Sequence, residues 1–75
     1  MKVELGIQPL DGIMVRLGFS NSDLVKISTE QLSHKMVQKG RKGRYLTPNI
    51  QHKILNALRA LESEENFEIK DIFNY

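Results

Sequence analysis

Apolar residues recur about every three or four positions through much of the chain, the pattern of helices that bury one face. The first stripe lies between Pro9 and Gly18, residues that favour the start and the end of a helix, respectively. Its members are Leu10, Ile13, Met14 and Leu17. The pattern therefore predicts a first helix that begins at Pro9 and stops at Gly18.

A second, longer stripe follows Thr47, which can cap a helix, and Pro48, which suits a first helical position. The apolar members of this stripe are Ile50, Ile54, Ala57, Leu58 and Leu61. They fall on one helical face and predict a helix from Pro48 to about Leu61.

Two capping signals stand between these stripes. In FSNSDL, Ser20 and Asp23 have the spacing of a capping box, and Phe19 can pack against Leu24 as a hydrophobic staple. This signal predicts a helix over about 20–27.

The segment ISTEQL repeats the pattern, with Ser28 as the cap, Gln31 reaching back, and Ile27 against Leu32. It predicts a helix over about 29–39, joined to the previous one by a tight corner with almost no loop. Gly40 is expected to end this helix, and GRKGRY to form an exposed basic loop.

The two ends of the chain carry weaker patterns. In residues 1–8, Val3, Leu5 and Ile7 alternate with polar residues, which favours a short extended arm. The segment 63–75 fits either a strand or a short helical turn, and we favour the turn. Its apolar residues lead us to expect that it docks on the helical core of residues 9–62.

Composition limits the chain to one small domain. It has 75 residues, of which 40% are hydrophobic and 27% charged, and no cysteine, so packing without disulfides must hold it together. With neither a signal-peptide pattern nor an apolar membrane span, we expect a cytoplasmic, nucleoid-associated protein without membrane contact. The fold class that these observations predict is all-α, with four to five helices in a single domain over 1–75.

The formal net charge of +2 hides an uneven distribution. Residues 31–61 contain no acid. Their basic residues are Lys35, Lys39, Arg41, Lys42, Arg44, Lys53 and Arg59. A basic middle between acidic flanks indicates one positive surface for a polyanion, although a merely solvated basic face would have the same composition.

The residues for catalysis or metal binding are few. There is no cysteine nucleophile and no glycine-rich phosphate loop, and His34 and His52 lack the spacing of metal ligands on a helix. We therefore expect no enzymatic activity, no metal and no cofactor.

The expected third helix has two chemically distinct faces. Leu32 and Met36 are expected to point inward, with Val37 beside them. The opposite stripe consists of Gln31, His34, Lys35 and Gln38. Glutamine and lysine can bind base edges, and a helix fits the major groove of DNA, so these four are candidate base-reading residues.

The basic loop after this helix suits phosphate. Its candidate phosphate ligands, together with the start of the next helix, are Lys39, Arg41, Lys42, Arg44 and Thr47. A base-reading helix beside phosphate-binding positions is typical of DNA-binding modules, in which backbone contacts position the protein and base contacts specify the sequence.

This order of parts resembles the lambda-repressor-like family (the Cro/CI or Xre type) of helix-turn-helix DNA-binding domains. The resemblance rests on SNSDLVKI, STEQLSHKMVQKG, GRKGRYLTPNIQHKILNALRAL and the ending IKDIF, and covers about residues 10–73. It implies a transcriptional regulator that binds double-stranded DNA, with the third helix in the major groove and dimers on paired half-sites.

Two alternatives from other classes remain open. GRKG is a GxxG segment with a basic centre, as in KH-type RNA-binding domains, and a basic patch alone does not distinguish RNA from DNA. A small helical domain can also serve as a protein-interaction module, for example in an antitoxin.

Overall fold

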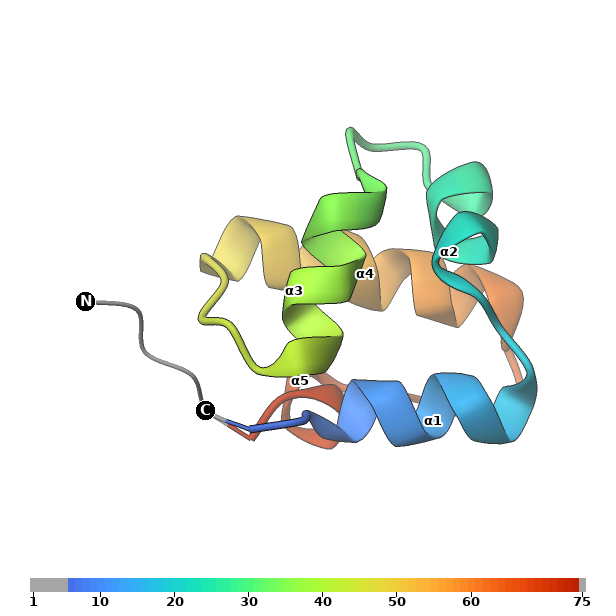
Figure 1. Cartoon of the computed structure of the whole chain (residues 1–75). Coiled ribbons are helices and arrows are strands. Elements are labelled where there is room, and N and C mark those ends of the chain that lie inside the picture. Colours follow the sequence, from blue (N-terminus) through green and yellow to red (C-terminus); the bar gives the residue numbers. More distant parts are fainter. Residues whose placement is uncertain (1–5, 75) are drawn as a thin grey trace.

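The computed structural model describes residues 6–74, which form five helices and no strand (Figure 1). The helices are α1 (Pro9–Leu17), α2 (Asn21–Ile27), α3 (His34–Lys42), α4 (Pro48–Leu61) and α5 (Ile69–Ile72). In Figure 1, α3 lies in front of α4, α1 runs below both, and α5 is behind, in contact with α1 and α4. The all-helical fold class is thereby confirmed.

The first two helices begin and end where their sequences predict. Pro9 opens α1, and Gly18 closes it in the left-handed conformation at φ 74°. Both bonds of the capping box at the start of α2 are present: Ser20 Oγ accepts from the Asp23 N–H at 3.3 Å, and the Ser20 N–H donates to Asp23 Oδ2 at 2.7 Å.

The start of α3 corrects a prediction. Ser28 does not cap this helix, because its N–H donates to the Leu24 carbonyl and thus closes α2. The Ser28 hydroxyl binds the backbone of Glu30, donating to its carbonyl at 3.0 Å and accepting from its N–H at 3.1 Å. Such local side-chain to backbone bonds compete with helix formation. The cap is Ser33, whose Oγ accepts from the Met36 N–H at 3.2 Å.

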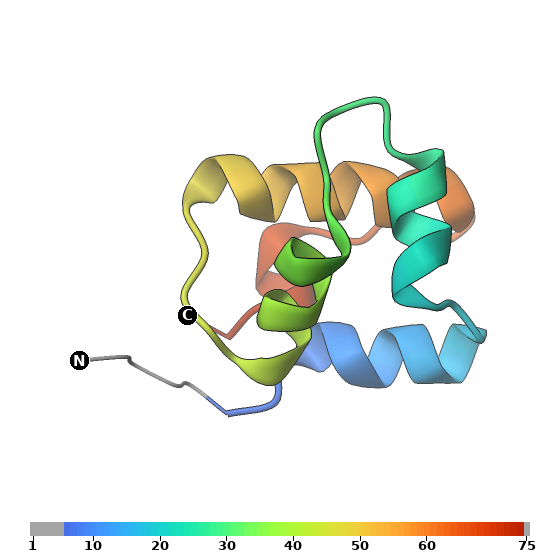
Figure 2. The same ribbon diagram turned by 45° about the horizontal axis from the view of Figure 1, so that its top comes forward.

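Helices α2 and α3 are therefore joined by a loop over residues 28–33, and the expected tight corner is wrong. The loop connects their upper ends in both views (Figures 1 and 2). Leu32 still reaches the core, with 8% of its surface exposed, but it does so from the loop.

The end of α3 corrects a second prediction. Gly40 lies inside the helix and is buried, and α3 continues to Lys42. A Cβ atom at Gly40 would come within 3.1 Å of Leu46, 3.3 Å of Ile54 and 3.3 Å of Phe73. The missing side chain thus lets α3 approach α4 and the C-terminal segment closely, and the true stop is Gly43 at φ 95°.

The core gathers residues from all five helices. The buried apolar residues are Leu10, Met14, Leu24, Leu32, Val37, Leu46, Ile54, Leu55, Ala57, Leu58, Phe67, Ile72 and Phe73. The C-terminal segment contributes three of them, and α5 confirms the helical turn expected there.

The chain before α1 is described from Gly6 onward, so the expected arm over residues 1–8 lies largely outside the described residues. The Gln8 N–H donates to the Arg41 carbonyl at 3.1 Å. The Gln8 side chain is buried, donating to the Gly6 carbonyl and accepting from the Asn74 N–H at 2.8 Å. These bonds attach the segment before α1 to both the end of α3 and the end of the chain. Within 6–74, no helix is long and apolar enough to cross a membrane.

Candidate nucleic-acid interface

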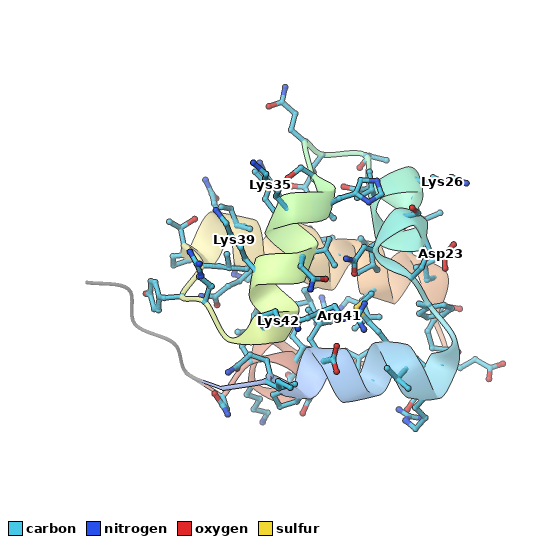
Figure 3. All side chains as sticks on the ribbon, in the orientation of Figure 1. Asp23, Lys26, Lys35, Lys39, Arg41 and Lys42 are labelled. Atoms are coloured by element: carbon cyan, nitrogen blue, oxygen red, sulfur yellow. The ribbon has the colours of Figure 1, made fainter. Side chains whose placement is uncertain are left out.

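The outer face of α3 is polar, basic and free of acids. Its exposed residues are His34, Lys35, Gln38, Lys39 and Lys42. At about 100° per residue they occupy about 140° of the helix circumference, so they form one continuous face. Figure 3 shows Lys35 and Lys39 extending from the side of α3 that is turned away from α2.

The inner face of α3 anchors the helix. Val37 and Gly40 are buried, and Met36 is half-buried. Val37 is thus buried more deeply than Met36, although the sequence pattern predicted Met36 as the inward-pointing residue. The basic face is thus carried by a helix whose opposite side is packed into the core.

Arg41 does not belong to the basic face, contrary to the expectation that it lies in an exposed phosphate-binding loop. It occupies the last turn of α3 and points toward α1 and α2 (Figure 3). Its Nε donates to Asp11 Oδ1 at 2.6 Å and its Nη1 to Asn21 Oδ1 at 2.8 Å. With 18% of its side chain exposed and both bonds made inside the protein, Arg41 holds three helices together.

Gln38 belongs to the same polar network. Its Oε1 accepts a hydrogen bond from Asn21 Nδ2 at 2.9 Å. One end of this candidate base-reading side chain is therefore bound to the first residue of α2, while the residue itself is exposed.

Gln31 is separated from the other candidate base-reading residues. Because α3 starts at His34, Gln31 lies in the loop over residues 28–33 and is exposed there. Its backbone carbonyl accepts from Lys53 Nζ at 3.3 Å, which ties the loop to α4. The structure thus places His34, Lys35 and Gln38 on one helical face and Gln31 in the loop before that helix.

A shallow hollow lies next to this face. It has a volume of about 330 Å³ and is lined by Gln38, Lys39, Lys42 and Arg44. Three cationic side chains around one opening, with an amide beside them, suit a phosphate group. Thr47 does not line the hollow: it is exposed at the start of α4 and makes no side-chain cap bond.

Tyr45 is a further candidate that was not predicted from the sequence. It follows Arg44, and 63% of its surface is exposed, which is unusual for a large aromatic side chain. Its position between a basic residue and Thr47 was the available signal, since aromatic rings beside cations are typical of nucleic-acid-binding surfaces.

The cations of the outer face differ electrostatically from several others in the domain. Arg16 pairs with Glu65 at 3.1 Å, and Lys70 pairs with Glu68 at 3.3 Å. Lys35, Lys39 and Lys42 form no ion pair with an acid of the described residues. Their charge is therefore available to an external anion.

Metal ligands are not grouped in the described part of the chain. Within residues 6–74, no three histidine or acidic side chains come together as a ligand set. The pKa of Asp23 is lowered, chiefly by the hydrogen bond from the Ser20 N–H and further by the Ser20 hydroxyl.

Comparisons with protein-family models, with curated proteins and with solved structures find no match to this chain.

Proposed function

We propose that this protein binds double-stranded DNA, with α3 in the major groove. The observation that carries the proposal is the outer face of α3, where Lys35, Lys39 and Lys42 are exposed, lack protein partners among the described acids, and have no acidic neighbour on the helix. A single helix is the element that enters the major groove, and phosphates on both sides of the groove attract its cations.

The residues of this surface divide into two groups. Lys39, Lys42 and Arg44 surround the hollow and would hold a phosphate, which gives affinity without sequence preference. His34, Lys35 and Gln38 lie nearer the start of α3 and can reach base edges. Exposed Tyr45 can pack against the sugar-phosphate backbone beside them.

The proposal includes a helix-turn-helix arrangement like that of the lambda-repressor-like family. Support comes from the order of five helices and from the position of α3 on the outside of the domain (Figure 1). The loop over residues 28–33 is longer than the usual turn of about three or four residues, so the motif would be a variant. In this proposal the protein is a small transcriptional regulator, and two copies would bind paired half-sites.

The KH-type alternative loses its main support. Its GxxG segment must be an exposed loop, whereas Gly40 is buried within α3 and Gly43 is buried at the end of the helix. A basic surface can still attract RNA, and the test therefore includes it.

The test compares duplex DNA with duplex RNA of the same sequence at two salt concentrations. Duplex RNA has a deep, narrow major groove that side chains cannot read, so binding should favour DNA. Replacing Lys35, Lys39 and Lys42 by alanine should weaken DNA binding and lower the salt slope by about 0.9 for each lost phosphate contact.

The matched control replaces Arg16, Lys26 and Lys70, three exposed cations outside α3, by alanine. This variant loses the same charge and should keep most of the affinity. Equal losses in both triple variants, or equal affinity for DNA and RNA duplexes, would contradict the proposal.

A further inference from the structure

A chain of polar contacts runs from α1 through α3 to α2 and back to the outer face of α3. Asp11 accepts from Arg41, Arg41 donates to Asn21 Oδ1, and Asn21 Nδ2 donates to Gln38 Oε1, with lengths of 2.6, 2.8 and 2.9 Å. Helices α1, α2 and α3 thus share one network, and its last member, Gln38, lies on the proposed interface.

The direction of every bond in this network is fixed by Arg41. A guanidinium group only donates, so the atom of Asn21 that faces Arg41 must be its oxygen. The Asn21 amide nitrogen then faces Gln38, and because that nitrogen only donates, Gln38 must present its oxygen to it. The orientation of the Gln38 amide therefore follows from hydrogen-bond chemistry.

This orientation leaves the nitrogen of Gln38 for a ligand. Gln38 is exposed, and among the described residues its Nε2 donates to no protein acceptor. A glutamine that is free to rotate can offer both donor and acceptor to adenine. A glutamine whose oxygen is bound to Asn21 chiefly offers donors.

We propose that Asn21 is a positioning residue that sets the base preference of Gln38 by holding its amide with the N–H₂ group toward DNA. Guanine, which presents O6 and N7 as two acceptors in the major groove, is the base that fits these donors. The inference rests on the proposed function and adds to it the base class read by one side chain.

The decisive variant is Asn21→Asp. Aspartate accepts from Arg41 as asparagine does, and a carboxylate is favourable in the first turn of α2. Its second oxygen cannot donate to Gln38, so the Gln38 amide should turn, donate to the carboxylate and expose its oxygen. Preference at the Gln38 position should then move from guanine to adenine or cytosine, whose amino groups donate.

The experiment selects binding sites from random DNA duplexes with wild type, Asn21→Asp, Gln38→Ala and the double variant Asn21→Asp/Gln38→Ala. Wild type should prefer guanine at one position by at least about fivefold, Gln38→Ala should lose that preference, and Asn21→Asp should reverse it. The added negative charge lowers affinity for all sequences, but comparison of bases within one variant removes this effect. In the Gln38→Ala background, Asn21→Asp should change no base preference.

A second measurement tests the orientation without DNA. In NMR spectra of wild type, one side-chain amide proton of Asn21 should exchange slowly with water, because it is bound to Gln38. In Asn21→Asp, a side-chain amide proton of Gln38 should exchange slowly instead. A merely structural role of Asn21 predicts neither this transfer nor a reversed base preference.

The outcomes separate the two proposals. Guanine preference that is unchanged in Asn21→Asp, or DNA binding with no preference at any position, overturns the role of Asn21 and leaves duplex binding intact. Absence of duplex binding by wild type overturns the proposed function, and with it the reading of guanine by Gln38.

Discussion

Gly43 lies directly against the backbone of Gly6. A Cβ atom at Gly43 would overlap the carbonyl oxygen of Gly6, and both glycines have positive φ angles, 95° for Gly43 and 82° for Gly6. The contact continues the pairing of Gln8 with Arg41, so the segment before α1 runs alongside the end of α3. Gly43 thereby fixes where the basic face ends and where the chain toward α4 begins.

Three glycine variants separate the effect of the positive φ angle at Gly43 from the effect of its contact with Gly6. Gly18→Ala tests backbone strain alone, since φ is 74° and the space is open, and should cost about 1–2 kcal/mol. Gly43→Ala adds the overlap with Gly6 and should lower the free energy of unfolding by more than Gly18→Ala does. Gly12→Ala, in the middle of α1 with open space, should raise the free energy of unfolding by about 0.5–1 kcal/mol. Urea unfolding of all three measures the differences, and equal losses for Gly18→Ala and Gly43→Ala would show that the contact with Gly6 is unimportant.

Arg41 and Lys42 are adjacent in the sequence but should respond oppositely to replacement. Arg41→Ala removes two hydrogen bonds and leaves Asp11, with 33% of its side chain exposed, without its cation. The free energy of unfolding should fall by about 1–3 kcal/mol. Lys42→Ala should change it by less than about 0.5 kcal/mol but weaken DNA binding. Thermal unfolding and DNA titration of both variants test these expectations. An Arg41→Ala protein that is as stable as wild type but binds DNA more weakly would show that Arg41 contacts DNA.

The anchoring of α3 gives a further prediction. Val37 is fully buried, so Val37→Ala should cost about 2 kcal/mol through lost apolar burial and a residual cavity. Met36 is half-buried, so Met36→Ala should cost less than the roughly 2–5 kcal/mol expected for a methionine at the centre of a core. Denaturant unfolding of the two variants gives the order, and a larger loss for Met36→Ala would contradict the assignment of Val37 as the main anchor.

The helices with unambiguous local signals could be predicted from the sequence. Pro9, Gly18 and Pro48 determine backbone conformation by themselves, and the bonds of the Ser20 capping box span only three residues. Such local chemistry needs no knowledge of the rest of the fold.

The limits of α3 depend on contacts that are distant in the sequence. Ser28 and Ser33 are both suitable caps, and the sequence does not say which one closes α2 and which one opens α3. Gly40 is a normal helix terminator, but here it gives Leu46, Ile54 and Phe73 room against α3. Because both limits were predicted too early in the sequence, α3 covers His34–Lys42 and not about 29–39, and Gln31 lies outside the helix.

The candidate site was affected in the same way. Lys35, Gln38, Lys39 and Lys42 remain exposed on one surface, since an acid-free amphipathic pattern survives a small change of helix limits. Arg41 was misassigned because its partners, Asp11 and Asn21, are 30 and 20 residues away in the sequence. No local sequence pattern shows that a cationic side chain is paired with residues of the same protein.

The capping box of α2 should make stability depend on pH. The Ser20 N–H and hydroxyl favour the ionised form of Asp23 and lower its pKa in the folded protein. A carboxyl group with a lowered pKa stabilises the fold above its unfolded pKa of about 4, and this contribution is lost as the pH falls through the folded value. Asp23→Asn removes the titrating group, so the difference in free energy of unfolding between wild type and this variant should be largest near neutral pH and shrink below about pH 4.

Urea unfolding of both proteins at a series of pH values measures this difference. Glu64→Gln is the control, because Glu64 is exposed and lies outside the helices, so the difference in free energy of unfolding between this variant and wild type should stay small throughout. A difference between wild type and Asp23→Asn that is constant from neutral pH to pH 2 would contradict the prediction. The result also concerns the interface, because the capping box orders the first turn of α2 and with it Asn21, the partner of Gln38.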